Sequence, residues 1–242
     1  MKEERYFYDP MLTGELPEEE ARHALRVLRL QMGDEFFLMD GDGCYHRAEI
    51  TVAAGHRCQY RIIERHRQEK AWEGRVHLAM APTKMNERTE WMAEKATEIG
   101  IDELTLLNCQ FSERRVMKTE RVERILVSAM KQSRKAWKPR LNGMTDFEHF
   151  VKEAKEEDKF ICHCYDPHDI NGGAEKPFLG DVLRRGRTTV VMVGPEGDFS
   201  VEEVRMAEEL GFRSVSLGRS RLRTETAALV AVHLMQITNQ IR

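Results

Sequence analysis

The stretch "VVMVGPEGDFSVEEVRMAEELG", residues 190–211, decides the fold of this chain. It opens with an apolar run, residues 190–193, of the kind that forms a central strand in a parallel sheet. The run stops at a loop in which Gly194 and Gly197 flank Pro195. Ser200 and Glu203 then have the spacing of a capping box, which predicts a helix that runs to a glycine at 211. A strand, a tight loop and a helix in this order predict an α/β domain.

The same rhythm of strands and helices extends from residue 74 to the end of the chain. Further strands are expected over residues 75–80, 103–109, 159–165 and 214–218. Further helices are expected over residues 86–100, 119–136, 145–154 and 224–236. Alternation of this kind predicts a parallel sheet covered by helices.

The ends and faces of these helices carry their own signals. Asn86 is placed to cap one helix and Gly100 to follow it, while Thr145 and Glu148 have the spacing of another capping box. The helix over 119–136 has an apolar face, made of Val122, Ile125, Leu126, Ala129 and Met130. The helix over 224–236 is apolar on most sides, which predicts packing inside a core or against a partner chain.

The chain before residue 74 has a different character. Its short apolar runs are broken by "DGDG" and "AAGH", which predicts hairpins, and one helix over residues 17–30 precedes them. Arg22, Arg26 and Arg29 share a face of that helix by their spacing. Two interpretations of this face stay open, a solvated surface and a stripe that contacts phosphates, and the spacing alone favours the first.

The composition excludes several classes of protein. The chain has 242 residues, 41% hydrophobic and 33% charged, and no stretch approaches the roughly 20 apolar residues of a membrane helix. The N-terminus has no apolar signal core, so we expect a cytoplasmic protein. "CHC" at 162–164 invites a zinc interpretation, but no second ligand pair lies at finger-like spacing. Buried cysteines in a strand are the favoured account, and no metal site is expected.

The charge is nearly balanced over the whole chain but not along it. The formal net charge is −3, yet the window "KQSRKAWKPR", residues 131–140, holds five cations and no acid. Such a patch can bind phosphates although the molecule as a whole does not attract them. Trp137 in this window has two interpretations, a core side chain or a platform on which a base stacks.

A second stretch repeats the design of the first. In "SVSLGRSRLRTETAALVAVHLMQ", residues 214–236, a strand ends near Gly218 and a helix follows a loop with three arginines. Ligands of open α/β sheets bind beyond the carboxyl ends of the strands, so the two glycine loops are placed to form one pocket. Neither loop matches the phosphate-binding patterns of NTPases or dinucleotide enzymes.

At these residues the sequence resembles a known family. "GPEGDFS" and "LGRSRLRTETA" are similar to the two C-terminal motifs of the bacterial 16S rRNA N3-uridine methyltransferases, the RsmE family. "HALRVLRLQMGDEFFLMDGDG", "KMNERTEWMAEKATEIGIDELTLLNCQFSERR" and "AMKQSRKAWKPRL" resemble its other blocks. The resemblance implies a PUA-like RNA-binding β-barrel over residues 1–72. It implies a SPOUT methyltransferase domain with a deep trefoil knot over residues 73–242.

The resemblance also implies a cofactor, partners and site residues. S-adenosylmethionine would bind between the two loops, the chain would form a homodimer through its C-terminal helix, and the product would be N3-methyluridine in 16S rRNA. The implied cofactor-binding residues are Val193, Gly194, Pro195, Glu196, Gly197, Leu217, Gly218, Ser220, Leu222, Arg223 and Thr224. The RNA-binding candidates are Arg22, Arg26, Arg29, Lys131, Arg134, Lys135, Lys138 and Arg221.

Both motifs depart from the family's pattern, at three positions in all. Asp198 stands where the commoner form of the first motif has glycine. In the second motif, Ser220 takes the place of an arginine and Arg221 that of an isoleucine. Arg221 has two interpretations, as a replacement for that arginine from a shifted direction or as an RNA contact.

The chemistry of the expected reaction suggests roles for charged residues. Glu196 and Asp198 are candidates to favour the cationic sulfonium. Uracil N3 carries a proton, so a base or a group that stabilises the uracil anion is needed. Arg223 and Glu225 are the catalytic candidates. Three interpretations of Glu225 stay open: a base, the partner of an arginine, and a carboxylate favoured at a helix start.

Rival hypotheses are a dimer that binds RNA without catalysis, a SPOUT enzyme that methylates a ribose 2′-oxygen, and an enzyme for a small metabolite. Binding of S-adenosylmethionine and analysis of methylated nucleosides distinguish them.

Overall fold

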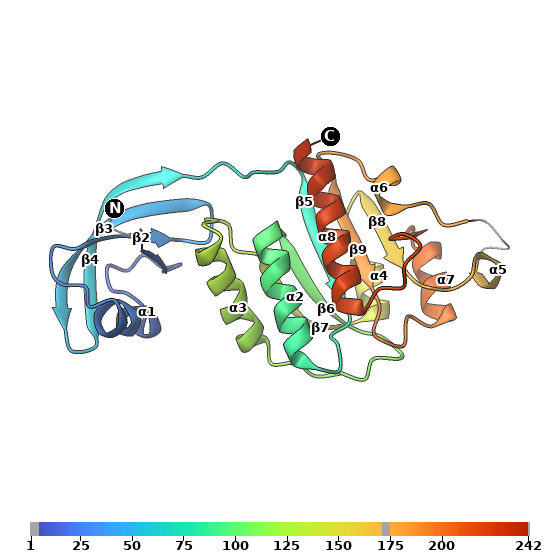
Figure 1. The fold of residues 1–242 in the computed structure, drawn as a ribbon, viewed down its shortest axis with the longest axis horizontal. Helices are drawn as coiled ribbons and strands as arrows, with labels where there is room; N and C mark the ends of the chain where they lie inside the picture. Colours follow the sequence, from blue (N-terminus) through green and yellow to red (C-terminus); the bar gives the residue numbers. More distant parts are fainter. Residues whose placement is uncertain (1–4, 171–174, 242) are drawn as a thin grey trace. The chain divides into compact units, whose positions relative to one another are not determined.

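A computed structural model describes residues 5–170 and 175–241 (Figure 1). The chain divides into two compact units. The first holds the chain up to Lys70 together with Val127–Lys138, and the second holds Ala71–Leu126 together with the chain from Pro139 onward. The unit boundary near residue 70 coincides with the change in sequence character at residues 65–74.

The first unit is built on a four-stranded sheet with the order β1-β2-β3-β4. Its strands are β1 (Tyr6–Tyr8), β2 (Glu35–Met39), β3 (Cys44–Ala54) and β4 (Arg57–Arg67). β1 pairs with β2 in parallel, and the other two pairs are antiparallel. Alternate residues of β3, such as Ala48 and Ile50, are buried, and they pack with Phe7, Phe36 and Leu38 in one core. The predicted β-rich segment is confirmed.

The helix of the first unit is shorter than the sequence predicts. α1 (Glu18–Arg22) continues into a π-helical turn, η1 (His23–Val27), in which the backbone N–H of Leu28 donates to the carbonyl of His23. Arg29 lies beyond the helix with a φ of +54°. The prediction that Arg29 shares a helical face with Arg22 and Arg26 is therefore wrong, because the helix ends before it.

The second unit is a six-stranded sheet with the order β10-β8-β9-β5-β6-β7, and every neighbouring pair is parallel. The strands are β5 (Arg75–Met80), β6 (Glu103–Asn108), β7 (Arg140–Asp146), β8 (Asp158–Cys162), β9 (Thr188–Val193) and β10 (Arg213–Val215). The predicted parallel sheet is confirmed. β7 was not predicted, because its sequence "RLNGMTD" is polar and lacks an apolar run.

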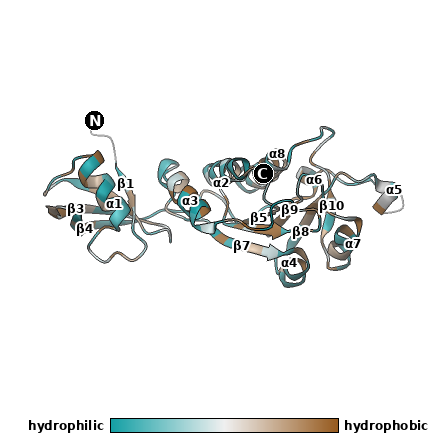
Figure 2. Cartoon of the chain, turned by 90° about the horizontal axis from the view of Figure 1, so that it is seen from below, coloured by the Kyte–Doolittle hydropathy of each residue, from teal (hydrophilic) through white to brown (hydrophobic). Residues whose placement is uncertain are grey.

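Helices cover both faces of this sheet (Figure 2). The helices are α2 (Asn86–Ile99), α3 (Thr119–Gln132), α4 (Phe147–Glu153), α5 (Pro167–Ile170), α6 (Leu179–Val182), α7 (Val201–Glu209) and α8 (Thr224–Ile241). One core packs α2, α6 and α8 against Leu78, Leu104 and Val191. The other packs α4 and α7 against Ala79, Ile161 and Met192. Neighbouring residues of β5 and β9 therefore enter opposite cores, as in a central strand buried on both faces.

The predicted helix caps are only partly confirmed. Ser200 and Glu203 form the capping box of α7, with both reciprocal hydrogen bonds present. Asn86 is the first residue of α2 and Met85 takes the cap position, so the Asn86 cap is wrong. The second capping box is also wrong. The hydroxyl of Thr145 donates to the carbonyl of Gly143, and Glu148 pairs with Lys152 on the surface of α4.

The apolar helix at the C-terminus is α8, which runs five residues beyond its predicted end, to Ile241. Val232 and Met235 are buried against α2 and β5. Within residues 5–170 and 175–241, none of the helices combines the length and the apolar character that crossing a membrane requires.

Candidate active site

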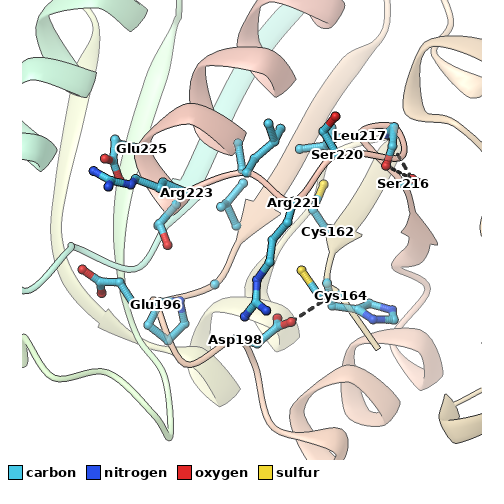
Figure 3. A pocket seen from close by; sticks show the side chains of 18 of the residues that line it. Cys162, Cys164, Glu196, Asp198, Ser216, Leu217, Ser220, Arg221, Arg223 and Glu225 are labelled. Carbon is cyan, nitrogen blue, oxygen red and sulfur yellow. Dashed lines mark hydrogen bonds between the residues drawn. The ribbon is translucent and has the colours of Figure 1, made fainter. Parts of the chain in front are cut away.

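A cavity of about 980 Å³ opens where β8, β9 and β10 end (Figure 3). Cys162, Val193 and Val215, the last residues of these three strands, lie in its wall. All of the residues that the sequence assigns to cofactor binding line it: Val193, Gly194, Pro195, Glu196, Gly197, Leu217, Gly218, Ser220, Leu222, Arg223 and Thr224. Glu225 and Arg221 line it too. The fold thus brings the two motifs, which begin at residues 194 and 217, around one space.

The loop after β9 leaves little room for side chains at its two glycines. A Cβ atom at Gly194 would lie 3.0 Å from both the backbone nitrogen and a ring carbon of Phe199. A Cβ atom at Gly197 would lie 3.1 Å from the Cβ of Phe111. Bare backbone therefore forms this wall of the cavity, where a ligand can approach it closely.

Asp198 in this loop has a φ of +68°, in the left-handed region that favours glycine. The backbone angle explains why glycine is the commoner residue of the family's motif at this position. The carboxylate of Asp198 accepts hydrogen bonds from the backbone N–H groups of Cys164 and Phe199, both at 2.8 Å. These bonds stabilise an aspartate in an unfavourable backbone conformation and join the loop to the end of β8.

Glu203 connects the same loop to the segment after β6. One of its carboxylate oxygens accepts the N–H of Ser200 at 2.8 Å, which completes the capping box of α7. The other accepts the N–H of Gln110, also at 2.8 Å. Glu203 is 9% exposed, so the bond to Ser200 is buried, while the bond to the exposed Gln110 is partly buried. The segment with Phe111 is thereby held against the glycine loop.

In the loop after β10, the side chains of Arg219, Ser220 and Arg221 are all exposed. Gly218 has a φ of +117°, and its N–H donates to the hydroxyl of Ser216 at 3.1 Å. The side chain of Arg221 points across the cavity toward Asp198, whereas Ser220 lies near Leu217 (Figure 3). Arg221 therefore presents its guanidinium to the first loop from the shifted motif position.

The start of α8 supplies the two catalytic candidates. Arg223 is exposed, and its carbonyl accepts the N–H of Ala227. Glu225 is only 7% exposed, and its Oε1 lies 3.8 Å from the Nε of Arg88, a residue of α2. Its other oxygen, Oε2, is buried and has no hydrogen-bond partner among the described residues. Arg88 lines the cavity as well, but no sequence signal distinguishes it from the other residues of a polar helix face.

The "CHC" segment forms part of the same wall. Cys162 ends β8 and is buried, but Cys164 is exposed beyond the strand, so its assignment as a buried strand residue is wrong. Within the described ranges, neither cysteine belongs to a cluster of possible metal ligands. The position of "CHC" at a predicted strand end was the signal that could have placed it in the pocket.

His163 sits in a buried chain of polar groups. Its Nε2 lies 2.9 Å from the hydroxyl of Ser214, which donates in turn to Glu208 at 2.6 Å. The ammonium of Lys176 donates to the carbonyls of His163 and Tyr165. Burial, with a smaller contribution from Lys176, lowers the pKa of His163 to about 4, and burial also lowers the pKa of Lys176. His163 is therefore neutral at pH 7 and fixes the end of β8.

The RNA-binding candidates other than Arg221 belong to the first unit. Arg22, Arg26 and Arg29 are exposed, and a guanidinium nitrogen of Arg26 lies 3.1 Å from a ring nitrogen of His56. Lys131 forms an ion pair with Glu20, and the guanidinium of Arg134 lies over the ring of Tyr6. Lys135 and Lys138 are half-buried. The basic window and the arginines near α1 are thus parts of the same unit.

Trp137 is held in place by the first unit. Its Nε1 donates to the carbonyl of Gln68 at 3.2 Å, and the guanidinium of Arg67 lies over its ring. The side chain is half-buried against Gly43, so its structural interpretation is favoured.

The sequence and the fold define the class of protein. A family model described as the RNA methyltransferase domain matches residues 70–236, and a model of the RNA methyltransferase PUA domain matches residues 16–64. The chain is therefore a member of the RNA methyltransferases that carry an N-terminal PUA-like domain.

Individual relatives narrow this class. The ribosomal RNA small subunit methyltransferase E of Aquifex aeolicus is 30% identical in an alignment that covers 95% of this chain and 97% of that protein. A probable rRNA-methyltransferase from Porphyromonas gingivalis, known from a crystal structure, is 39% identical with a TM-score of 0.89. The match covers 97% of this chain and 98% of that chain. The ribosomal RNA small subunit methyltransferase E of Neisseria gonorrhoeae, whose crystal structure has S-adenosyl methionine bound, is 28% identical with a TM-score of 0.82. The match covers 96% of this chain and 97% of that chain. This chain belongs to the ribosomal RNA small subunit methyltransferase E family.

Proposed function

We propose that this protein transfers a methyl group from S-adenosylmethionine to N3 of a uridine in 16S rRNA of the small ribosomal subunit. The observation that carries the proposal is the single cavity around which both family motifs meet, at the ends of β8, β9 and β10. The Neisseria relative binds S-adenosyl methionine and has the same fold over nearly the whole chain.

The residues of the cavity fit this cofactor. The bare backbone at Gly194 and Gly197 allows close approach of a flat ring or a ribose. Glu196 lines the cavity with its Oε1 accepting the N–H of Lys84 at 2.9 Å, which leaves a carboxylate facing a cationic ligand. The bound cofactor would supply an electrophilic methyl group on a sulfonium.

The finer features of the fold are also part of the proposal. We infer that the segment from β9 to α8 is tied in a trefoil knot, as in the SPOUT class. We also infer a homodimer that uses α8, because this helix is apolar on most sides. We also assign an RNA-binding domain to residues 1–72 and a methyltransferase domain to residues 73–242. The same proposal includes action in the cytoplasm.

The residues of this chain would act mainly by positioning. Methyl transfer requires in-line approach of the uracil N3 and little covalent help, so orientation supplies much of the rate. The N3 proton must leave, and Glu225 and Arg223 are the groups at the cavity wall that can accept it or stabilise the uracil anion. Because N3 lies on the Watson–Crick edge, a paired target would have to be exposed first.

RNA recognition would rest on phosphate contacts. Folded RNA is recognised largely by shape and backbone, and the exposed arginines of the first unit match that need. Lys131 is the weakest candidate of this set, since Glu20 already neutralises part of its charge.

The experiment is methyl transfer from labelled S-adenosylmethionine to small subunits that lack this modification, followed by nucleoside analysis. We expect 3-methyluridine in the digest. A digest with 2′-O-methyluridine would contradict the assigned atom, and a folded protein that binds RNA but transfers no methyl group would contradict the enzymatic function.

A further inference from the structure

Two charged residues meet at the cavity from different helices. Arg88 lies in the first turn of α2, and Glu225 lies in the first turn of α8. The distance of 3.8 Å between Nε and Oε1 is an ion-pair distance but too long for a hydrogen bond. Among the described residues, Glu225 is the one acidic partner of Arg88. The two side chains therefore attract each other electrostatically, and they do not form a hydrogen bond with each other.

Glu225 is buried and yet has an oxygen without a partner. The residue is 7% exposed, and Oε2 is inaccessible without accepting a hydrogen bond within the described part of the chain. The dipole of α8 favours a carboxylate in the first turn, but it does not supply a donor to a buried oxygen. Buried polar atoms are nearly always satisfied, so a carboxylate in the cavity wall with one unpaired oxygen is a place for a ligand's N–H once the side chain turns toward the cavity.

The chemistry of uracil fits this pair. Its Watson–Crick edge presents a carbonyl oxygen, the N3–H and a second carbonyl oxygen. A carboxylate can accept only from the N3–H, and a guanidinium can donate only to a carbonyl oxygen. Cytosine has an N3 without a proton, which a carboxylate would repel. The two residues thus match the edge that the reaction modifies.

We propose that the Glu225 carboxylate turns toward the cavity and accepts the N3–H of the target uracil while Arg88 donates to a neighbouring carbonyl oxygen. This inference rests on the proposed function and names the groups that select the base. The N3 proton moves to the Glu225 carboxylate, and the N3 electron pair forms the bond to the methyl carbon. The electron pair of the carbon–sulfur bond stays on sulfur, and Glu225 leaves the step as a carboxylic acid that solvent deprotonates.

Other charged groups line the same cavity, and Glu225 has an alternative role beside them. Glu196, Asp198, Arg219, Arg221 and Arg223 share its wall. A buried carboxylate there could instead bind the cationic part of S-adenosylmethionine. In that case its removal would weaken cofactor binding and leave the rate at saturating cofactor unchanged.

The test uses the full-length protein, unmodified small subunits and labelled S-adenosylmethionine. Glu225→Gln keeps the size of the side chain but removes the proton acceptor. We expect kcat to fall by about 100-fold or more, in the range of lost general-base catalysis, with the Kd of S-adenosylmethionine within about threefold of the parent. Glu87→Gln is the matched control, because Glu87 is exposed beside Arg88 and does not line the cavity.

Three further variants exclude a merely structural role. Glu225→Ala should regain activity when formate is added, whereas Glu225→Gln should not. Arg88→Lys should keep more activity than Arg88→Ala, because an ammonium still donates to a carbonyl oxygen.

The outcomes separate this inference from the proposed function. A parent that yields 3-methyluridine beside a Glu225→Gln variant of equal kcat would overturn the inference alone. Loss of cofactor affinity with kcat preserved at saturation would also overturn it and assign Glu225 to the cofactor. A parent that yields no 3-methyluridine would overturn the proposed function first.

Discussion

Glu203 offers the sharpest test of how the cavity is held together. Its carboxylate accepts the N–H of Ser200 and the N–H of Gln110, and both bonds are 2.8 Å long. Hydrogen bonds to a charged group contribute about 1.5–3 kcal/mol each, and a helix cap contributes about 1 kcal/mol. Glu203→Ala removes both acceptors at a site that is 9% exposed. We expect the free energy of unfolding to fall by about 3 kcal/mol, since water can satisfy the two N–H groups only in part.

The assay is urea unfolding followed by tryptophan fluorescence, with Glu203→Gln and Glu202→Ala beside it. The amide of glutamine keeps one acceptor, so this variant should lose about half as much as alanine. Glu202 lies in the same helix turn but is exposed, and its removal should cost no more than about 0.5 kcal/mol, the value of a helix-dipole interaction. If Glu203→Ala and Glu202→Ala cost the same, the assigned connection between the two loops is wrong.

Further predictions concern the loop, the buried histidine and the RNA surface. Asp198→Ala should destabilise the protein by about 1 kcal/mol more than Asp198→Gly. Both variants lose the same hydrogen bonds, but only alanine is strained at a φ of +68°. Equal losses of unfolding free energy in urea would argue against this strain. The pKa of His163 is lowered to about 4, so the unfolded chain takes up a proton before the folded one does as the pH falls below 6.5. The free energy of unfolding should fall by up to about 3 kcal/mol between pH 6.5 and 4, and His163→Gln should lose this part of the pH dependence; an unchanged profile would contradict the buried neutral state. Arg22→Ala should reduce the slope of log affinity for small-subunit rRNA against log salt by about 1, measured by filter binding, and an unchanged slope would remove Arg22 from the phosphate contacts.

Much of the second unit could be predicted from its sequence, because apolar runs mark strands that are buried on both faces. β5 has the bounds that the pattern predicts, β9 contains the predicted apolar run 190–193, and the Ser200 capping box is present. β7 was missed because it lies at the edge of the sheet, where a polar strand pairs on one side only. The Thr145 cap failed because β7 continues through that position, so its backbone serves the sheet before it can start a helix.

The glycine loops of the cavity could be predicted for a related reason, since their residue types are dictated by the backbone. Arg88 and the buried, neutral state of His163 could not, because an ionisable residue on a helix or after a strand looks the same whether it faces solvent or a pocket. Their roles depend on which helix packs beside which strand, and that is a property of the folded chain.

The most direct measurement is calorimetric titration of the folded protein with S-adenosylmethionine, beside a Gly194→Trp variant. A Cβ atom at Gly194 already lies 3.0 Å from Phe199, so an indole there must displace the loop or fill the cavity. We predict saturable binding of S-adenosylmethionine by the parent and none by a variant that circular dichroism shows to be folded. A folded parent that binds no S-adenosylmethionine, alone or with small subunits present, would contradict the central claim that this cavity is the cofactor site of a methyltransferase.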